Sequence, residues 1–290
     1  MNNLQLPLVS RIAPTPSGYL HIGNAVNFII TWLYVQKFKG ELILRIDDLD
    51  SSRVRDKYID DIFFQLDWLG INIDKGPSGA EEFKNKYSQK YRITLYDDFI
   101  KSIKFNGAFL YNCSCSRTMV KKLYHDSIYR GHCRNLNLKG IGSKRIKVDN
   151  SELFELMGDF IVYQKNNRPS YQVASLVDDI FYKVNLIIRG EDLWPSTQAQ
   201  GYLSCFVNDN PFKNIICLHH PLLKDSKNNK LSKSSGATSL KELRKDNSNL
   251  QYIYNLVSRV LGINIKVDNL NNLLDEFIKI DFTHKFNEIV

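Results

Sequence analysis

Short apolar segments alternate with segments of helical periodicity along the first part of the chain, and this order constrains the fold more than any other feature. Residues 4–9 and 41–47 have the length and apolar character of buried strands. Residues 25–39 and 58–69 instead repeat apolar side chains at helical spacing, and Gly70 ends the second repeat. Strand, helix, strand and helix in this order predict an α/β fold with a parallel sheet and right-handed crossover connections.

Residues 11–24, with the sequence RIAPTPSGYLHIGN, connect the first predicted strand to the first predicted helix. His21 and Gly23 stand at the start of that helix. The first turn of a helix offers unpaired N–H groups and a positive dipole end, so this connection predicts an anion-binding site. In parallel sheets ligands bind beyond the carboxyl ends of the strands, where Arg11 and Asp47 fall. The alternative is an ordinary turn with an incidental histidine and with solvated charges at the strand ends.

The composition indicates a soluble globular protein of one large domain or two modest ones. The 290 residues are 43% hydrophobic and 24% charged, and no apolar run is long enough to span a bilayer. The net charge of +8 favours a polyanionic partner without requiring one. No signal peptide is expected, and an odd number of cysteines, five, does not suggest a disulfide framework. We therefore expect a cytoplasmic protein with no membrane association.

The rest of the chain continues the α/β pattern around a region of different composition. Residues 76–98 are polar and helical in pattern, and the stretch up to about residue 150 is rich in Lys, Arg, Asn and Gly, which suggests an inserted subdomain. Pro195 is expected at the first position of a helix over 195–207, and the C-terminal region is helical in pattern. Strands are predicted at residues 107–111, 144–148, 159–164, 171–177, 184–192 and 215–218.

Three cysteines in the inserted region have the spacing of a metal site. One residue separates Cys113 from Cys115, and Cys133 follows further along. Thiolates are favoured ligands of structural zinc, and a tetrahedral site needs a fourth group. Tyr129 lies one helical turn before Cys133, whereas His132 is the chemically easier donor. The spacing leaves this choice open, and three unrelated thiols are the alternative.

A lysine-rich loop follows the last predicted strand and contains the sequence KLSKS at residues 230–234. A basic loop at that place can bring a lysine to phosphates and neutralise charge that develops during transfer. Most lysine-rich loops are simply solvated. The interpretation as a phosphate-binding loop depends on its occurrence together with residues 21–24, with alternating strands and helices between them.

Together these motifs resemble the class I glutamyl-tRNA synthetases. The similarity lies in residues 11–24, in LRIDDLD at 44–50 and in KLSKS, and it extends over nearly the whole chain. The resemblance implies a Rossmann-type class I aminoacyl-tRNA synthetase catalytic domain with a zinc-bearing α+β insertion and a C-terminal helical segment. The implied boundaries are 1–80 and 181–236 for the discontinuous catalytic domain, 81–180 for an acceptor-binding-like subdomain with the zinc site, and 237–290 for the helical segment, which resembles a stem-contact segment.

The sequence ends soon after KLSKS, so an anticodon-binding domain like that of the longer glutamyl-tRNA synthetases is not expected. This length, together with the arrangement CxC…YxxxC, resembles the short paralogues of the family, the glutamyl-Q tRNA(Asp) synthetases. In that group three cysteines and a tyrosine hold one structural zinc ion. The resemblance therefore implies Cys113, Cys115, Tyr129 and Cys133 as the ligands, and it favours Tyr129 over His132.

The resemblance also assigns the substrate-binding residues. A guanidinium pairs bidentately with a carboxylate, which suits two arginines to a substrate with two carboxylates. Asp47 is implied to bind the α-ammonium group. The implied glutamate site consists of Arg11, Ile12, Ala13, Pro14, Thr15, Asp47, Tyr171 and Arg189. The implied ATP site consists of His21, Gly23, Asn24, Lys230, Ser232 and Lys233, of which His21 and Lys233 are catalytic.

Three positions depart from the family pattern. Asn24 replaces the last histidine of the HIGH motif, at a position that varies in this family. Asp47 replaces the usual glutamate and is one methylene shorter, which can loosen the ammonium contact or recruit a water molecule. Leu231 replaces the methionine of KMSKS, a swap that conserves volume and is expected to be nearly neutral.

The resemblance implies a ligase that converts L-glutamate and ATP, with Mg²⁺, to glutamyl-adenylate without needing tRNA. The glutamate then passes to queuosine at the wobble position of tRNA(Asp), and the enzyme is expected to act as a monomer. One alternative is a compact glutamyl-tRNA synthetase-like enzyme that charges a tRNA 3′ end. The other is a non-catalytic tRNA-binding relic of the fold, against which the presence of His21, Lys233, Arg11 and Arg189 argues.

Overall fold

The computed structural model describes residues 7–140, 142–208, 211–223, 239–246, 248–263, 265–280 and 287–289. The chain divides into two compact units, each built from segments that are not contiguous in sequence. The first unit comprises Met1–Tyr91, Val184–Asp192 and Ile215–Val290, and the second comprises Arg92–Lys183 and Leu193–Asn214.

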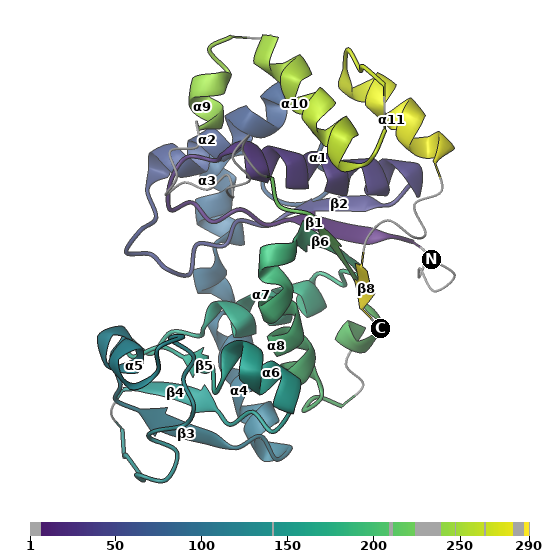
Figure 1. Cartoon of the computed structure of the whole chain (residues 1–290). Helices are drawn as coiled ribbons and strands as arrows, with labels where there is room; N and C mark the ends of the chain where they lie inside the picture. Colours follow the sequence, from purple (N-terminus) through teal and green to yellow (C-terminus); the bar gives the residue numbers. More distant parts are fainter. Residues whose placement is uncertain are drawn as a thin grey trace. The chain divides into compact units, whose positions relative to one another are not determined.

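A five-stranded sheet in the order β2-β1-β6-β7-β8 forms the centre of the first unit (Figure 1). The first four strands are parallel, as the alternation of strands and helices predicted, and β8 pairs antiparallel with β7. A hydrogen bond from Ser10 Oγ to Leu186 O, 2.8 Å long, also joins β1 to β6. The strands are β1 (Val9–Ile12), β2 (Glu41–Leu44), β6 (Leu186–Gly190), β7 (Ile216–His220) and β8 (Asn287–Ile289).

Helices cover this sheet and supply most of the apolar core of the first unit. The first helix, α1, contacts β1 and β6 and also packs against α10 and α11. Its sequence is apolar around most of its circumference, which is the pattern of a helix buried on several sides. The helices are α1 (Ile22–Lys37), α2 (Asp56–Trp68), α3 (Ala80–Glu82), α9 (Leu240–Leu243), α10 (Ser248–Val260) and α11 (Leu270–Lys279), with the short turns η1 (Phe83–Tyr87) and η2 (Gln89–Arg92) after α3.

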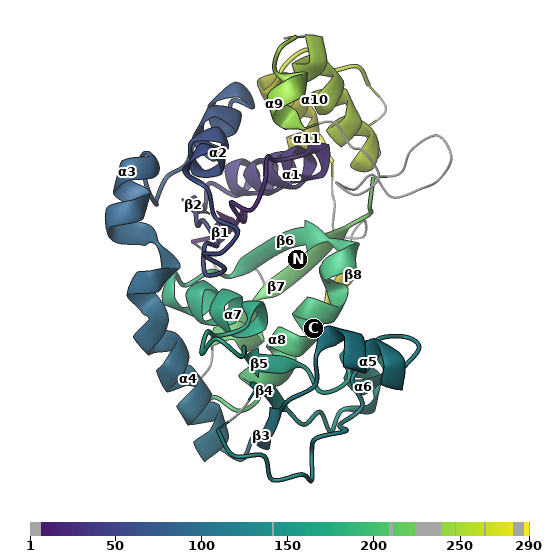
Figure 2. The same cartoon turned by 90° about the vertical axis from the view of Figure 1, so that its left-hand side faces the viewer.

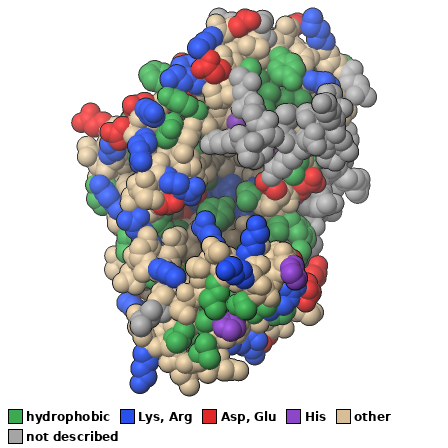
Figure 3. Space-filling model, turned by 60° about the vertical axis from the view of Figure 1, so that its left-hand side comes forward, with side chains coloured by type: hydrophobic (Ala, Val, Ile, Leu, Met, Phe, Trp, Pro, Cys, Tyr) green, Lys and Arg blue, Asp and Glu red, His purple; other side chains and the backbone are tan. Residues whose placement is uncertain are grey.

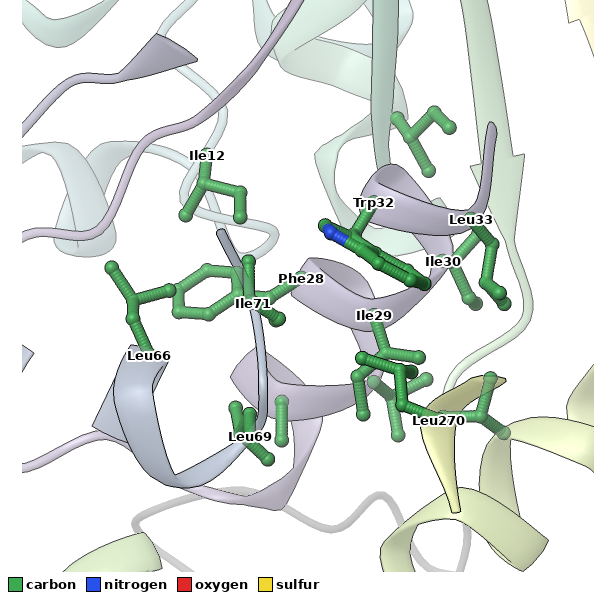
Figure 4. Close-up of a cluster of buried hydrophobic side chains, with 14 of the residues drawn as sticks. Ile12, Phe28, Ile29, Ile30, Trp32, Leu33, Leu66, Leu69, Ile71 and Leu270 are labelled. Carbon is green, nitrogen blue, oxygen red and sulfur yellow. The ribbon is translucent and has the colours of Figure 1, made fainter. Parts of the chain in front are cut away.

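Side chains of α1 converge with β1, α2 and α11 in one apolar cluster (Figure 4). Ile29 and Leu33 of α1 and Leu69 after α2 are completely buried. Burial of each such side chain stabilises the fold by about 1.5–3 kcal/mol. This packing fixes the start of α1, and therefore the position of His21, relative to the sheet.

The second unit contains a three-stranded antiparallel sheet in the order β3-β4-β5 (Figure 2). Its helix α4 is joined to α7 by a buried ion pair, in which Arg92 Nε lies 2.7 Å from Asp178 Oδ1. The strands are β3 (Leu110–Cys113), β4 (Ser143–Ile146) and β5 (Ile161–Tyr163). The helices are α4 (Ile93–Phe105), α5 (Arg117–Leu123), α6 (Ser151–Met157), α7 (Tyr171–Phe181) and α8 (Trp194–Ser204), with the 3-10 turns η3 (Glu191–Leu193) and η4 (Pro211–Asn214) beside α8.

The predicted strand at residues 171–177 is wrong, because this segment is the first part of helix α7. Every residue from Val173 to Asp179 is buried, and a short buried run of this kind is compatible with either state. Two other strands lie later than predicted: β1 begins at Val9 and β3 ends at Cys113. Strand β8 was not predicted.

No helix in the described part of the chain combines the length and the apolar character that crossing a membrane requires.

Candidate functional site

The carboxyl ends of the parallel strands in the first unit carry the charged residues that the sequence singled out. Arg11 lies near the end of β1, Asp47 follows β2, and Arg189 lies near the end of β6. All three are buried, with at most 6% of each residue exposed. Because these strands are parallel, their ends share one edge of the sheet, where ligands bind in folds of this type.

The segment after β1 runs beside the segment after β2. Asp47 N donates to Pro14 O at 2.9 Å, and Arg45 N donates to Ile12 O at 2.9 Å. These bonds bring the predicted glutamate-binding residues Arg11 to Thr15 next to Asp47. Of this group Thr15 is exposed and Ala13 is half-buried, while Ile12 and Pro14 are buried.

Asp47 forms a buried ion pair with Arg45. Arg45 Nε lies 2.7 Å from Asp47 Oδ1, and Arg45 Nη2 lies 3.2 Å from Asp47 Oδ2. The two side chains point to the same face because residues i and i+2 of an extended segment do so. The arginine therefore compensates the charge of the acid and fixes its orientation.

Two histidines at the end of β7 lie beside Arg189. In the register of β6 and β7, His219 is opposite Arg189 and His220 is opposite Gly190. Burial lowers the pKa of His219 to about 4, and the positive charge of Arg189 and the neighbouring His220 contribute. Burial also lowers the pKa of His220. Both imidazoles are therefore neutral near pH 7.

Asn27 of α1 connects the helix to the ends of β6 and β7. Its Nδ2 donates to Ile188 O at 3.1 Å and lies 3.3 Å from His220 Nε2. The other ring nitrogen of His220 lies 3.0 Å from Pro221 O. An amide nitrogen can only donate, so these contacts select the tautomer of His220 that carries its proton on Nδ1.

His21 caps the N-terminus of α1. Its Nδ1 accepts a hydrogen bond from Gly23 N at 3.1 Å, and Asn24 Oδ1 accepts one from His21 N at 3.0 Å. A side chain on Gly23 would place its Cβ 3.0 Å from the imidazole, so the glycine lets the ring lie against the main chain. The predicted ATP-binding residues His21, Gly23 and Asn24 thus form one capped helix start.

Residues 239–241, which follow KLSKS in sequence, contact the segment around His21. Ser239 forms a β-bridge with His21, and Leu240 N donates to Leu20 O at 2.8 Å. Lys241 of α9 adds a hydrogen bond from its Nζ to Tyr19 Oη at 2.9 Å. The predicted residues Lys230, Ser232 and Lys233 lie outside the described part of the chain.

Tyr171, the remaining predicted glutamate-binding residue, belongs to the second unit. It is the first residue of α7, and 41% of its surface is exposed. The neighbouring Gln172 donates from Nε2 to Ser196 Oγ of α8 at 3.1 Å. The start of α7 is thereby attached to α8 within the second unit.

The second unit brings the three predicted cysteine ligands together. The Sγ atoms of Cys113, Cys115 and Cys133 all lie within 4.8 Å of one another, and all three residues are buried. A zinc ion with Zn–S bonds of about 2.3 Å in a tetrahedron separates its sulfur ligands by about 3.8 Å. The three thiols therefore fit a structural zinc ion with modest movement.

Tyr129 contributes its hydroxyl group to the same place. Its Oη accepts a hydrogen bond from Cys133 N at 2.6 Å and is hydrogen-bonded to the thiols of Cys113 and Cys133. His132 is exposed and is not a member of the thiol group. Of the two candidates for a fourth ligand, the arrangement favours Tyr129.

The three thiols interact strongly with one another. Cys115 Sγ and Cys133 Sγ are 3.5 Å apart. Burial raises the pKa of Cys115 to about 12, and its hydrogen bond to Cys133 adds to this shift. Burial opposes ionisation of Cys133 as well, but hydrogen bonds from Tyr129, from the Ser114 main chain and from the other thiols lower its pKa to about 7. Cys133 therefore ionises more readily than Cys115.

Sequence reasoning assigned no role to Arg45, Asn27, His219 or His220. The two-residue spacing of Arg45 and Asp47 at a strand end was a usable signal for their contact. The histidines follow the last apolar strand directly, which places them at the same edge of the sheet as Arg189. The contact of Asn27 with His220 joins residues far apart in sequence, and no local pattern indicates it.

A parallel α/β sheet with buried charges at its carboxyl edge and a capped helix start defines a protein of the nucleotide-binding α/β class. A family model described as tRNA synthetases class I (E and Q), catalytic domain, matches residues 7–140 and 137–289. The chain belongs to this family. The resemblance of residues 11–24 and of LRIDDLD to the glutamyl-tRNA synthetases is thereby confirmed at the level of the family.

Curated relatives of two kinds are similar to the chain. The Glutamate--tRNA ligase 2 of Syntrophus aciditrophicus (strain SB) is 33% identical over 263 residues, which cover 81% of this chain and 53% of that protein. The glutamyl-Q tRNA(Asp) synthetase of Prochlorococcus marinus (strain MIT 9303) is 32% identical over 246 residues, covering 81% of this chain and 76% of that protein. The chain thus spans about half the length of the first relative.

The fold is also similar to a solved structure, that of a glutamate tRNA ligase from Elizabethkingia meningosepticum CCUG26117 in complex with its amino acid. The TM-score is 0.71 at 19% identity, and the similarity covers 94% of this chain and 65% of the other. It supports the predicted fold class, a Rossmann-type class I synthetase catalytic domain with a small insertion and C-terminal helices.

Proposed function

We propose that this protein activates L-glutamate with ATP and transfers it to queuosine at the wobble position of tRNA(Asp). The observation that carries the proposal is the group of three buried thiols with the Tyr129 hydroxyl, in a chain of the glutamyl and glutaminyl class I synthetase family. The CxC…YxxxC arrangement resembles that of glutamyl-Q tRNA(Asp) synthetases. Relatives of that name are among the similar proteins.

In the proposed activation step, Arg11 and Arg189 bind the two carboxylates of glutamate. Asp47 binds the α-ammonium group, and Tyr171 with the segment 12–15 completes the site. The position of Arg11, Asp47 and Arg189 at one edge of the sheet supports this assignment, and so does their burial, since charge pairing is stronger away from water. The ion pair with Arg45 holds the Asp47 carboxylate in a fixed orientation.

His21, Gly23 and Asn24 are assigned to the ATP phosphates, together with Lys230, Ser232 and Lys233. The α-carboxylate of glutamate attacks the α-phosphorus, and pyrophosphate leaves. Catalysis then consists of positioning and of charge stabilisation by His21 and Lys233. The pairing of Ser239 with His21, shortly after Lys233 in sequence, supports placing these residues in one site. Mg²⁺ enters with ATP, since it bridges phosphate oxygens.

In the transfer step, a hydroxyl of the queuosine cyclopentene-diol attacks the glutamyl carbonyl, and AMP leaves. Exposed basic residues of the second unit are proposed to contact the anticodon loop. Figure 3 shows Lys and Arg side chains gathered on one face of that unit. Binding through phosphates is salt-dependent, so transfer is expected to weaken as ionic strength rises. The exposed basic residues of the second unit include Arg117, Lys121, Lys122, Lys139, Lys144 and Lys165.

The first unit is proposed to carry catalysis and the second to carry the inserted acceptor-binding part. Cys113, Cys115, Tyr129 and Cys133 would hold one zinc ion, which supplies structural cross-linking of a region with few apolar side chains of its own. The substrates place the protein in the cytoplasm, and a monomer is the proposed functional state.

The competing function is the charging of a tRNA 3′ end. The similarity to glutamate–tRNA ligases favours it, because it shares every activation residue. Both functions need glutamate activation, but one attaches glutamate to queuosine in the anticodon and the other attaches it to the 3′ end of the tRNA. Glutamate-dependent ATP–pyrophosphate exchange tests the shared step, and it is expected to proceed in the complete absence of tRNA. A folded, zinc-loaded protein that shows no exchange would refute the proposed activity.

A further inference from the structure

Arg145 of β4 stacks on the ring of Tyr129. The guanidinium carbon of Arg145 lies 3.8 Å from the centre of the ring. Only 8% of Arg145 is exposed, and its Nε atom has no hydrogen-bond partner in the described structure. The flat contact with Tyr129 is therefore a principal interaction of this side chain.

In the described structure, the carboxylate of the neighbouring Asp159 does not form an ion pair with Arg145. Asp159 is completely buried, and its carboxylate accepts bonds from Arg134 at 2.7 and 2.8 Å, from Tyr111, and from Val148 N. Arg145 instead donates from Nη1 to the main-chain oxygen of Asp159 at 2.5 Å. Arg134 thus pairs with Asp159, and the positive charge of Arg145 remains directed at the tyrosine.

The main chain of Tyr129 is held by the same segment. Asp159 N donates to Tyr129 O at 2.9 Å, and Gly158 forms a β-bridge with Tyr129. Gly158 has φ +60°, and a Cβ there would lie 2.1 Å from Tyr129 O, so only glycine allows this approach. Tyr129 is therefore fixed on its main-chain side by residues 158–159 and on its ring by Arg145.

We propose that Arg145 is the positioning residue and counter-charge of the metal site. This inference rests on the proposed zinc site. Zinc bound by three thiolates carries one more negative charge than positive, and burying such a group costs free energy unless a cation lies nearby. A guanidinium on the ring face supplies that cation without competing for a ligand atom. It also holds the hydroxyl of Tyr129 toward the thiols. Groups that contact a metal-ligating side chain orient that side chain and change the affinity of the site for the metal.

The test compares metal binding by full-length variants. Zinc affinity is measured by competition with a chelator, and the visible bands of the cobalt-substituted protein report the coordination geometry. Arg145→Met is expected to weaken zinc binding about 10- to 100-fold and to change the cobalt bands. Arg145→Lys keeps the charge but loses the planar stack, so its zinc affinity is expected to lie between those of the wild type and Arg145→Met. Lys144→Met is the matched control, because Lys144 is the exposed neighbour on the same strand and lies over Tyr163 instead.

A double-mutant cycle separates positioning of Tyr129 from general stability. In a Tyr129→Phe background the ring remains but the hydroxyl is gone, so Arg145→Met removes only the counter-charge and is expected to weaken zinc binding clearly less than in the wild-type background. An equal loss in both backgrounds would overturn the inference that Arg145 positions Tyr129, as would an Arg145→Lys protein with wild-type affinity and cobalt spectrum. Failure of the wild-type protein to bind zinc or cobalt would overturn the metal site itself, together with this inference.

Discussion

The proposed metal site of the second unit and the proposed substrate site of the first unit are built in different ways. The thiols and Tyr129 lie within a short span of sequence and are gathered by one strand end and one connecting segment. The proposed substrate residues of the first unit come from the ends of β1, β2 and β6, which are far apart in sequence. The first kind of site depends on local geometry, and the second depends on the whole sheet.

This difference determines how charge is stabilised. In the first unit the buried carboxylate of Asp47 is paired with the guanidinium of Arg45, two residues before it. In the second unit the thiols have only one another, Tyr129 and nearby N–H groups in the described structure. A structural zinc ion is the partner proposed for these thiols. Loss of the metal is therefore expected to affect the second unit far more than the first.

Removing one thiol tests this contrast with the largest expected effect. Cys133→Ser is expected to lower the Tm of the second unit by roughly 10 °C or more, because loss of a structural metal is among the few single changes that cost above about 4 kcal/mol. Chelation of zinc from the wild type should produce the same change. Cys205→Ser is the control, since Cys205 is an exposed thiol outside the group. If Cys133→Ser and Cys205→Ser had the same Tm, the assignment of Cys133 as a metal ligand would be contradicted.

Removing Arg45 tests the corresponding stabilisation in the first unit. Arg45→Met leaves Asp47 buried without this cation and is expected to lower the free energy of unfolding by about 3–5 kcal/mol. Glu41→Gln breaks an exposed pair in which Lys75 Nζ lies 3.7 Å from Glu41 Oε1, and it is expected to cost less than about 1 kcal/mol. Denaturant titration measures both. A cost for Arg45→Met as small as that for Glu41→Gln would show that the ion pair does not stabilise the unit.

The histidines beside Arg189 predict how the first unit responds to acid. The pKa of His219 lies near 6.5 in the unfolded chain and at about 4 when folded, because of burial, Arg189 and His220. The unfolded chain therefore takes up a proton first as the pH falls below 6.5. The free energy of unfolding is expected to decrease by up to about 3 kcal/mol between pH 6.5 and 4.

His219→Asn should flatten this dependence, leaving the smaller part due to His220. His125→Asn serves as the control at an exposed position. Unfolding free energies of the three proteins across this pH range provide the measurement. An unchanged slope in His219→Asn would mean that this histidine is not the group responsible.

The smallest expected effect on stability separates the two roles of His21. His21→Ala removes the helix cap and is expected to cost about 1 kcal/mol, whereas His21→Asn keeps a capping side chain and should cost a few tenths. Both variants are expected to slow glutamate-dependent pyrophosphate exchange by about a hundredfold or more, because neither has the imidazole. Exchange at the wild-type rate in His21→Asn would reduce His21 to a capping residue.

The same contrast explains what the sequence could predict. Spacing alone located Cys113, Cys115 and Cys133, because their contact depends on residues close in sequence. The carboxyl-edge residues Arg11 and Asp47 followed from the order of strands and helices, which is enough to place strand ends on one edge. The partners that come from distant strands, such as Asn27 for His220, have no local pattern.

The error at α7 has a physical cause as well. Residues 171–177 have a length that suits a strand, and because Val173 to Asp179 are all buried, their pattern has no periodicity that separates a helix from a strand. The choice between Tyr129 and His132 could not be made from spacing either. It depends on which side chain turns inward, and Tyr129, the buried one, is contacted by Gly158 and Arg145, which are distant from it in sequence.

The most direct test of the account measures glutamate transfer to two tRNA(Asp) samples that differ only in queuosine. The zinc-loaded protein, labelled glutamate and ATP are incubated with each tRNA, and the product is then treated with mild alkali. The account predicts labelling of the queuosine-containing tRNA alone, at the anticodon and not at the 3′-terminal adenosine. Equal labelling of both samples, or label at the 3′ end, would contradict it.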